Sequence, residues 1–235
     1  MNMLDKETFK FLKDLESNNN RNWFLQNKPR YVKYIKEPIE SICDNLKSTF
    51  GTAHIFRPNR DLRFSKIKIP YKTQASFEIK VGASGFYFQV SKDSILIGAG
   101  IWGTEKDQLL NFRNIFSTES KKILDANTKT AESIKSYLVK MEKLGFEISK
   151  EDSLKTAPRG FDKNSPDIIM LRLRHLAILK EYKIDKIKDW VCTAELLKVI
   201  KKDFNNLKEW NDILNKNVGA TKIIMKPRVR ENLTH

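Results

Sequence analysis

The residues best suited to binding chemistry lie together in the segment RPNRDLRFSKIKIPYKTQ, Arg57 to Gln74. Two prolines exclude a regular helix here, so the charges of the segment cannot simply cover one helix face. In an extended stretch alternate side chains share a side, which places Asp61 with Arg63 and Ser65. A carboxylate beside arginines can hold a guanidinium fork in place for a bidentate phosphate or carboxylate ligand. The alternative is a network of internal ion pairs that staples a loop to the domain.

A second candidate is Arg159, which stands between Pro158 and Gly160. Proline stiffens one side of this turn and glycine permits an unusual backbone angle on the other, so the arginine is presented from a rigid turn. We expect it to converge with the Arg60 to Lys72 loop. An ordinary exposed turn arginine is the alternative.

The sequence Gly98-Ala-Gly100-Ile-Trp-Gly103 matches the G-x-G-x-x-G pattern of dinucleotide-binding loops. Its context argues against that function, because the preceding strand is the return arm of a hairpin rather than the first strand of a parallel unit. Trp102 is also bulky where a pyrophosphate needs close backbone approach. We interpret the motif as a turn at a strand end and expect no cofactor.

Metal binding and nucleophilic catalysis have no sequence signature. His54, His175 and His235 are isolated from one another and from Cys43 and Cys192, with no ligand spacing. No nucleophile motif is present, so catalytic residues stay unassigned. Two lone cysteines are typical of a reducing cytoplasm, where we expect the protein to be found.

The positive charge is concentrated in three segments. The chain carries 44 Lys+Arg against 29 Asp+Glu, a net charge of +15. Residues 21–36 hold five bases and no acid, residues 57–80 hold seven bases and two acids, and residues 222–235 hold four bases and one acid. Such clusters suit phosphate-bearing partners, although an abundance of surface lysine has the same effect on net charge.

Length and composition indicate one globular domain. The chain has 235 residues, 40% of them hydrophobic, and no Pro-rich or Gly/Ser-rich linker divides it. We expect a single domain over residues 1–217 and a basic extension over residues 218–235. The longest apolar runs, such as residues 95–101, are far shorter than the roughly 20 residues that cross a bilayer, so we predict no membrane partner.

Hydrophobic periodicity predicts an α+β fold, a central antiparallel sheet flanked by N-terminal and C-terminal helices. We expect a helix capped by Asp5, a short helix around Trp23, and a helix from Pro29 that Pro38 kinks or restarts. Alternation predicts four strands, at residues 54–57, 76–81, 85–91 and 94–100. Helical spacing predicts further helices near residues 109–116, 134–144, 168–182 and 194–215.

Three motifs, NNNRNWF, RPNRDLRFSKIKIPYK and LKTAPRGFDKNSPD, resemble those of the DUF2461 family over nearly the whole domain. The resemblance implies an α+β domain with no established activity. It groups the motif residues Trp23, Arg60, Asp61, Arg63, Phe64, Ser65, Lys68, Pro70, Tyr71, Lys72, Pro158, Arg159 and Gly160. The family usually has aspartate where Ile67 stands and histidine where Ser165 stands, which weakens a catalytic role but leaves binding by Arg, Lys and Tyr.

We therefore expect an Arg/Lys/Tyr pocket that binds a phosphorylated or other anionic small molecule. The expected ligand-binding residues are Trp23, Arg60, Asp61, Arg63, Ser65, Lys68, Tyr71, Lys72 and Arg159. One alternative is a nucleic-acid-binding module that uses the basic segments for phosphates and Trp23, Phe64 or Tyr71 for stacking. Another is an interaction protein in which the motifs only stabilise the fold.

Overall fold

The computed structural model describes residues 3–63, 68–117 and 124–219. Helices precede and follow a central sheet in these residues, so the predicted α+β class is confirmed. In chain order the elements are α1 (Lys6–Ser17), α2 (Arg21–Gln26), α3 (Lys28–Tyr31), the π-helical turn η1 (Val32–Lys36), α4 (Glu37–Phe50), β1 (Ala53–Ile55), β2 (Gln74–Val81), β3 (Ser84–Ser91), β4 (Ser94–Ile101), α5 (Lys106–Ile115), α6 (Leu124–Lys143), β5 (Glu147–Ile148), α7 (Ile168–Arg172), β6 (Leu176–Lys183), α8 (Ile184–Ile187) and α9 (Glu195–Asn217).

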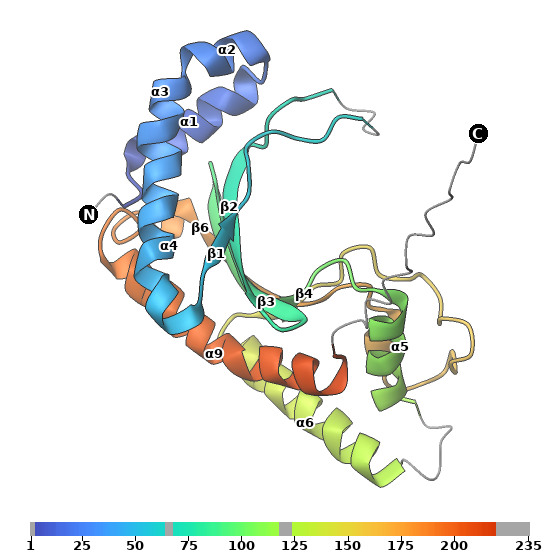
Figure 1. Cartoon of the computed structure of the whole chain (residues 1–235). Coiled ribbons are helices and arrows are strands. Elements are labelled where there is room, and N and C mark those ends of the chain that lie inside the picture. Colours follow the sequence, from blue (N-terminus) through green and yellow to red (C-terminus); the bar gives the residue numbers. More distant parts are fainter. Residues whose placement is uncertain (1–2, 64–67, 118–123, 220–235) are drawn as a thin grey trace, which may run out of the picture.

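The six strands form one sheet in the order β1-β2-β3-β4-β6-β5, and every neighbouring pair is antiparallel. Hairpins join β2 to β3 and β3 to β4, the second through the predicted connection at Lys92 and Asp93. Helices α4 and α9 pack on one face of the sheet (Figure 1).

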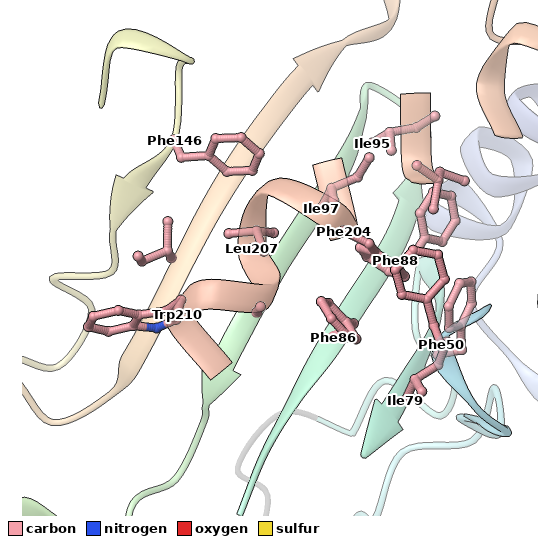
Figure 2. Close-up of a cluster of buried hydrophobic side chains, with 14 of the residues drawn as sticks. Phe50, Ile79, Phe86, Phe88, Ile95, Ile97, Phe146, Phe204, Leu207 and Trp210 are labelled. Atoms are coloured by element: carbon pink, nitrogen blue, oxygen red, sulfur yellow. The ribbon is translucent and has the colours of Figure 1, made fainter. Parts of the chain in front are cut away.

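The core lies between this sheet face and the helices. Aromatic and aliphatic side chains from α4, β2, β3, β4 and α9 meet there (Figure 2). Trp210 of α9 is 0% exposed, and its indole Nε1–H donates to the Leu176 carbonyl at 3.1 Å. The stripe of α9 that includes Trp210 is therefore core, as its spacing predicts.

The N-terminal helices follow their local signals. Asp5 and Thr8 form a capping box at the start of α1. Pro38 lacks an N–H for the Tyr34 carbonyl, and the Thr8 hydroxyl donates to that carbonyl instead, at 2.8 Å. Before Pro38 the helix widens into the π-helical turn η1, in which the Glu37 N–H donates to the Val32 carbonyl five residues earlier.

The predicted helix over residues 168–182 is wrong. The structure has the short helix α7 over residues 168–172 and then the strand β6, which pairs with β4 along its whole length. The run Leu176–Ala177–Ile178 is buried, and periodicity alone cannot distinguish a short buried strand from a buried helix segment.

The glycine motif serves strand packing, whereas the sequence predicted a turn at a strand end; of its three glycines only Gly103 lies beyond β4. Gly98 and Gly100 lie within β4 beside β6. A Cβ at Gly98 would lie 2.7 Å from the Ile178 carbonyl, and one at Gly100 would overlap the Leu176 carbonyl. These glycines let the two backbones approach closely.

Candidate functional site: a basic groove at the base of an arm

The chain between β1 and β2, described over residues 56–63 and 68–73, forms an arm that extends beyond the sheet (Figure 1). Its base is paired like a short ladder: the Arg60 N–H donates to Pro70 at 2.9 Å and the Lys72 N–H donates to Pro58 at 2.8 Å. An isolated bridge joins Asn59 to Tyr71. Pro58 and Pro70 thus take part in this ladder through their carbonyl oxygens, which accept, and neither needs an N–H group for this.

Asn19 fastens the arm to the N-terminal helices. Its side-chain Nδ2 donates to the Tyr71 carbonyl at 3.0 Å, and its Oδ1 accepts from the Tyr71 N–H at 3.0 Å. The Tyr71 ring stacks on Phe24 of α2, with centroids 3.9 Å apart and planes 12° from parallel. An amide clamp and an aromatic stack therefore fix the position of Tyr71.

A groove of about 580 Å³ lies between this arm base and the helices α2, α3 and η1. It has an aromatic and proline wall with basic side chains around it. The lining residues are Arg21, Phe24, Leu25, Lys28, Tyr31, Val32, Lys36, Pro58, Asn59, Pro70 and Tyr71.

The groove has a surplus of positive charge. Three cations line it, Arg21, Lys28 and Lys36, and none of the lining residues is acidic. Lys36 forms an exposed ion pair with Glu40 at 3.6 Å, whereas Arg21 and Lys28 form no ion pair with other described residues. Burial, with a smaller contribution from Glu40, raises the pKa of the Tyr31 hydroxyl, which therefore stays protonated and can donate to an anion.

Asp61 and Arg63 neutralise each other instead of facing a ligand. The Arg63 Nε lies 3.0 Å from Asp61 Oδ1 and its Nη2 lies 2.5 Å from Oδ2. The hydrogen bonds from Arg63 hold the pKa of the Asp61 carboxyl below its ordinary value. Both side chains are largely exposed, as in a local staple of the arm. This pair fits the ion-pair alternative for the segment.

The other predicted residues are divided between several environments. The Lys68 Nζ donates to the Leu62 carbonyl at 3.0 Å, within the arm. Trp23 packs on Phe11, with ring centroids 5.7 Å apart, and does not line the groove. Ser65 lies outside the described residues, as do Phe64 and Ile67.

Arg57, Arg60 and Lys72 form a cluster of like charges at the arm base. The Arg60 Nε donates to the Tyr71 carbonyl at 3.1 Å, and the Lys72 Nζ lies 5.2 Å from the centroid of the Phe56 ring. Partial burial lowers the pKa of Lys72, and repulsion from Arg57 and Arg60 lowers it further.

Arg159 does not join these residues. Its segment, residues 155–165, lies on the α5 side of the molecule, away from the arm (Figure 1). Arg159 is exposed and Gly160 has a φ of 85°, so the rigid turn is present. Ser165 begins the approach to α7, where its hydroxyl accepts from the Asp167 N–H at 3.2 Å.

Arg21, Lys28 and Lys36 line the groove and Asn19 clamps the arm, although none of the four is among the predicted site residues. Their signal was the acid-free run of bases over residues 21–36. In the groove that run faces the segment over residues 57–80, which contributes Pro58, Asn59, Pro70 and Tyr71 to the lining but none of its bases.

The chain is an α+β protein with a groove lined by basic and aromatic residues. The family model described as "Conserved hypothetical protein (DUF2461)" matches residues 7–212, so the chain belongs to this family. A search of curated proteins gave no match. The described helices include none long and apolar enough to span a membrane. Within the described ranges, no three His, Cys, Asp or Glu side chains lie close enough together to hold a metal ion.

Proposed function

We propose that the protein binds a phosphorylated or similarly anionic small molecule in the groove at the base of the arm. The observation that carries this proposal is the surplus of Arg21, Lys28 and Lys36 around a groove whose lining contains no carboxylate. Arg21 and Lys28 form no ion pair with other described residues and Lys36 has only its exposed pair with Glu40, so these cations repel one another, and an anion relieves that repulsion.

The wall of the groove adds directional contacts. Arg21 can donate to two oxygens of a phosphate at once, whereas Lys28 acts as a point charge. The Tyr31 ring gives an apolar contact, and its protonated hydroxyl can donate to an oxygen. This combination suits an anion carried on a small organic body.

Binding is supported better than catalysis. The described lining residues include no carboxylate, imidazole or thiol, which are the usual acid–base and nucleophilic groups. Ser165, at a position where the resemblance to DUF2461 implies histidine, is engaged in the turn before α7.

The proposal is tested by thermal denaturation with pyrophosphate or glucose 6-phosphate, and with glucose as the uncharged control. A ligand at 100 times its dissociation constant stabilises by about 2.7 kcal/mol, equivalent to roughly 5–10 °C for a chain of this size. We expect that shift in the wild type and its loss in the double variant Arg21→Gln, Lys28→Gln.

The matched control is the double variant Arg159→Gln, Lys163→Gln, which removes the same charges from exposed positions away from the groove. It should keep the full shift. An equal loss of the shift in both double variants would show that net charge is responsible, and a full shift in both would show that Arg21 and Lys28 do not hold the anion; either result would contradict the proposal.

A further inference from the structure

In the described residues, the face of the sheet opposite the core is uncovered at β2 and β3 (Figure 1). Along β3, Phe86, Phe88 and Val90 point to the core and are at most 3% exposed, whereas the alternating residues Tyr87 and Gln89 are only partly buried. Helices α4 and α9 lie on the core face, and no described helix covers the other face at β2 and β3 (Figure 1).

Three aromatic rings lie on this open face at the edge nearest the arm. The register places His54 opposite Glu78 and Glu78 opposite Tyr87, so these residues share a side of the sheet. Phe56 lies next to them, with its ring centroid 5.1 Å from His54 and 6.5 Å from Tyr87. We call His54, Phe56 and Tyr87 the aromatic row.

Unneutralised cations border the aromatic row. Lys72 lies over the Phe56 ring at 5.2 Å and is close enough to Arg57 and Arg60 for their charges to lower its pKa. No described carboxylate forms an ion pair with these three cations.

Two carboxylates of the open face, Glu78 and Glu181, are paired with lysines, whereas Glu147 of β5, which the register also places on this face, lies at the opposite edge of the sheet from β1. Glu78 lies 3.5 Å from Lys80, and Glu181 lies 2.8 Å from Lys183. Residues two apart on a strand share a face, so each of these two acids is neutralised by a lysine of the same surface. The aromatic row is therefore left with an excess of positive charge.

We propose that this face binds single-stranded nucleic acid, with bases on the aromatic row and phosphates on Arg57, Arg60 and Lys72. Aromatic rings on an open sheet next to cations that track a backbone are the two elements of single-strand recognition. A duplex buries its bases in stacked pairs, so it would have only the cations to contact. This surface is distinct from the groove, and the inference does not depend on the function proposed for the groove.

The open shape of the surface favours a polymer over a free nucleotide. A small ligand gains affinity by enclosure, whereas a strand adds stacking and phosphate contacts from successive units. Of the aromatic residues predicted for stacking, Trp23 packs on Phe11, Tyr71 is 6% exposed against Phe24, and Phe64 lies outside the described residues.

The test is fluorescence anisotropy of the full chain with a labelled 20-nucleotide single strand of mixed sequence, a duplex of the same sequence, and a labelled mononucleotide. Neutralisation of about three phosphates gives a slope of about −2 in log affinity against log salt, or roughly a 15-fold loss between 50 and 200 mM salt. Phe56→Leu, which keeps an apolar side chain but removes the ring, should weaken single-strand binding about tenfold. Lys72→Gln should lower the magnitude of the salt slope by about 0.7.

The matched controls are Tyr34→Leu and Lys33→Gln. Lys33 lies over the Tyr34 ring at 5.0 Å, the same arrangement as Lys72 over Phe56, but in η1 on the helical side of the molecule. Both controls should bind the single strand like the wild type, and circular dichroism should show that every variant is folded. Absence of single-strand binding, equal affinity for the duplex or the mononucleotide, or equal effects of Phe56→Leu and Tyr34→Leu would each overturn the proposal.

Discussion

Replacement of Asn19 by alanine should loosen the arm, because one side chain makes both hydrogen bonds that tie Tyr71 to the N-terminal helices. The Nδ2 to Tyr71 carbonyl and Tyr71 N–H to Oδ1 distances are both 3.0 Å. The variant removes both partners at once. The Tyr71 carbonyl keeps its bond from the Arg60 Nε at 3.1 Å, but the Tyr71 N–H keeps no partner among the described residues.

The size of the effect follows from this asymmetry. The lost bond to the carbonyl contributes about 1 kcal/mol, since another donor remains. The orphaned N–H of a residue that is only 6% exposed costs a further ~1–2 kcal/mol. We therefore expect Asn19→Ala to lower the free energy of unfolding by about 2–3 kcal/mol.

Urea denaturation measures the loss, and amide hydrogen exchange at Tyr71 locates it. The neighbour Asn18 supplies the matched control, because its Nδ2 bonds to the Asp14 carbonyl in an exposed position and does not reach the arm. Asn18→Ala should cost under about 1 kcal/mol and leave the exchange of the Tyr71 amide unchanged. If the two alanine variants are equally stable, or if Tyr71 stays protected in Asn19→Ala, the clamp does not hold the arm.

Two further predictions concern a glycine of the strand β4 and a buried carboxyl of the helix α9. Gly100→Ala should destabilise by more than about 3 kcal/mol in thermal denaturation, because its φ is +129° and its Cβ would overlap the Leu176 carbonyl, whereas Gly103→Ala meets no atom within 4 Å and should cost only about 1 kcal/mol; similar losses at the two positions would contradict the packing role of the motif. Burial raises the pKa of the Asp203 carboxyl, although the Tyr182 hydroxyl donates to it at 2.6 Å. The folded chain then holds this proton more tightly than the unfolded chain, so the carboxyl stabilises fully only below the ordinary aspartate pKa of about 3.9, and that stability is lost as pH rises through the raised pKa. Asp203→Asn should therefore reduce the fall in stability between about pH 4 and pH 7 in urea titrations, and a parallel pH dependence in variant and wild type would refute this.

Elements with local signals were predictable from the sequence. The Asp5 cap, the connection at Lys92 and Asp93, and the alternation of β3 each depend on residues a few positions apart. The pairing of Asp61 with Arg63 is local as well, since alternation already places them on one side of an extended chain. In each case short-range geometry decides the outcome.

The strand β6 could not be assigned in this way. Its first half, Leu176 to Ile178, is buried and therefore lacks the alternation that identifies a half-exposed strand. Pairing with β4 decides its structure, and this pairing joins Ile101 to Leu176 across the helices α5 and α6. Such long-range contacts override local preference.

The groove could not be predicted from the sequence either, because it also depends on a long-range contact. The excess of bases over residues 21–36 and 57–80 was visible, but the contact that unites them is the bond between Asn19 and Tyr71, 52 positions apart. Arg159 shows the opposite error. Its turn has the predicted glycine geometry, with φ of 85° at Gly160, yet a well-formed local motif does not fix which distant segment it faces.

Tyr71 and Lys72, which are adjacent in the arm, face different surfaces because side chains alternate along an extended chain. Adjacent residues in an extended chain point to opposite sides, and the base of the arm is held extended by the bonds from Arg60 to Pro70 and from Lys72 to Pro58. Tyr71 accordingly stacks on Phe24 and lines the groove, while Lys72 turns to Phe56 on the open sheet face. Tyr71 therefore belongs to the groove and Lys72 to the border of the aromatic row. For this reason a substitution at Tyr71 should affect the groove without removing the cation of the aromatic row, and a substitution at Lys72 should do the reverse.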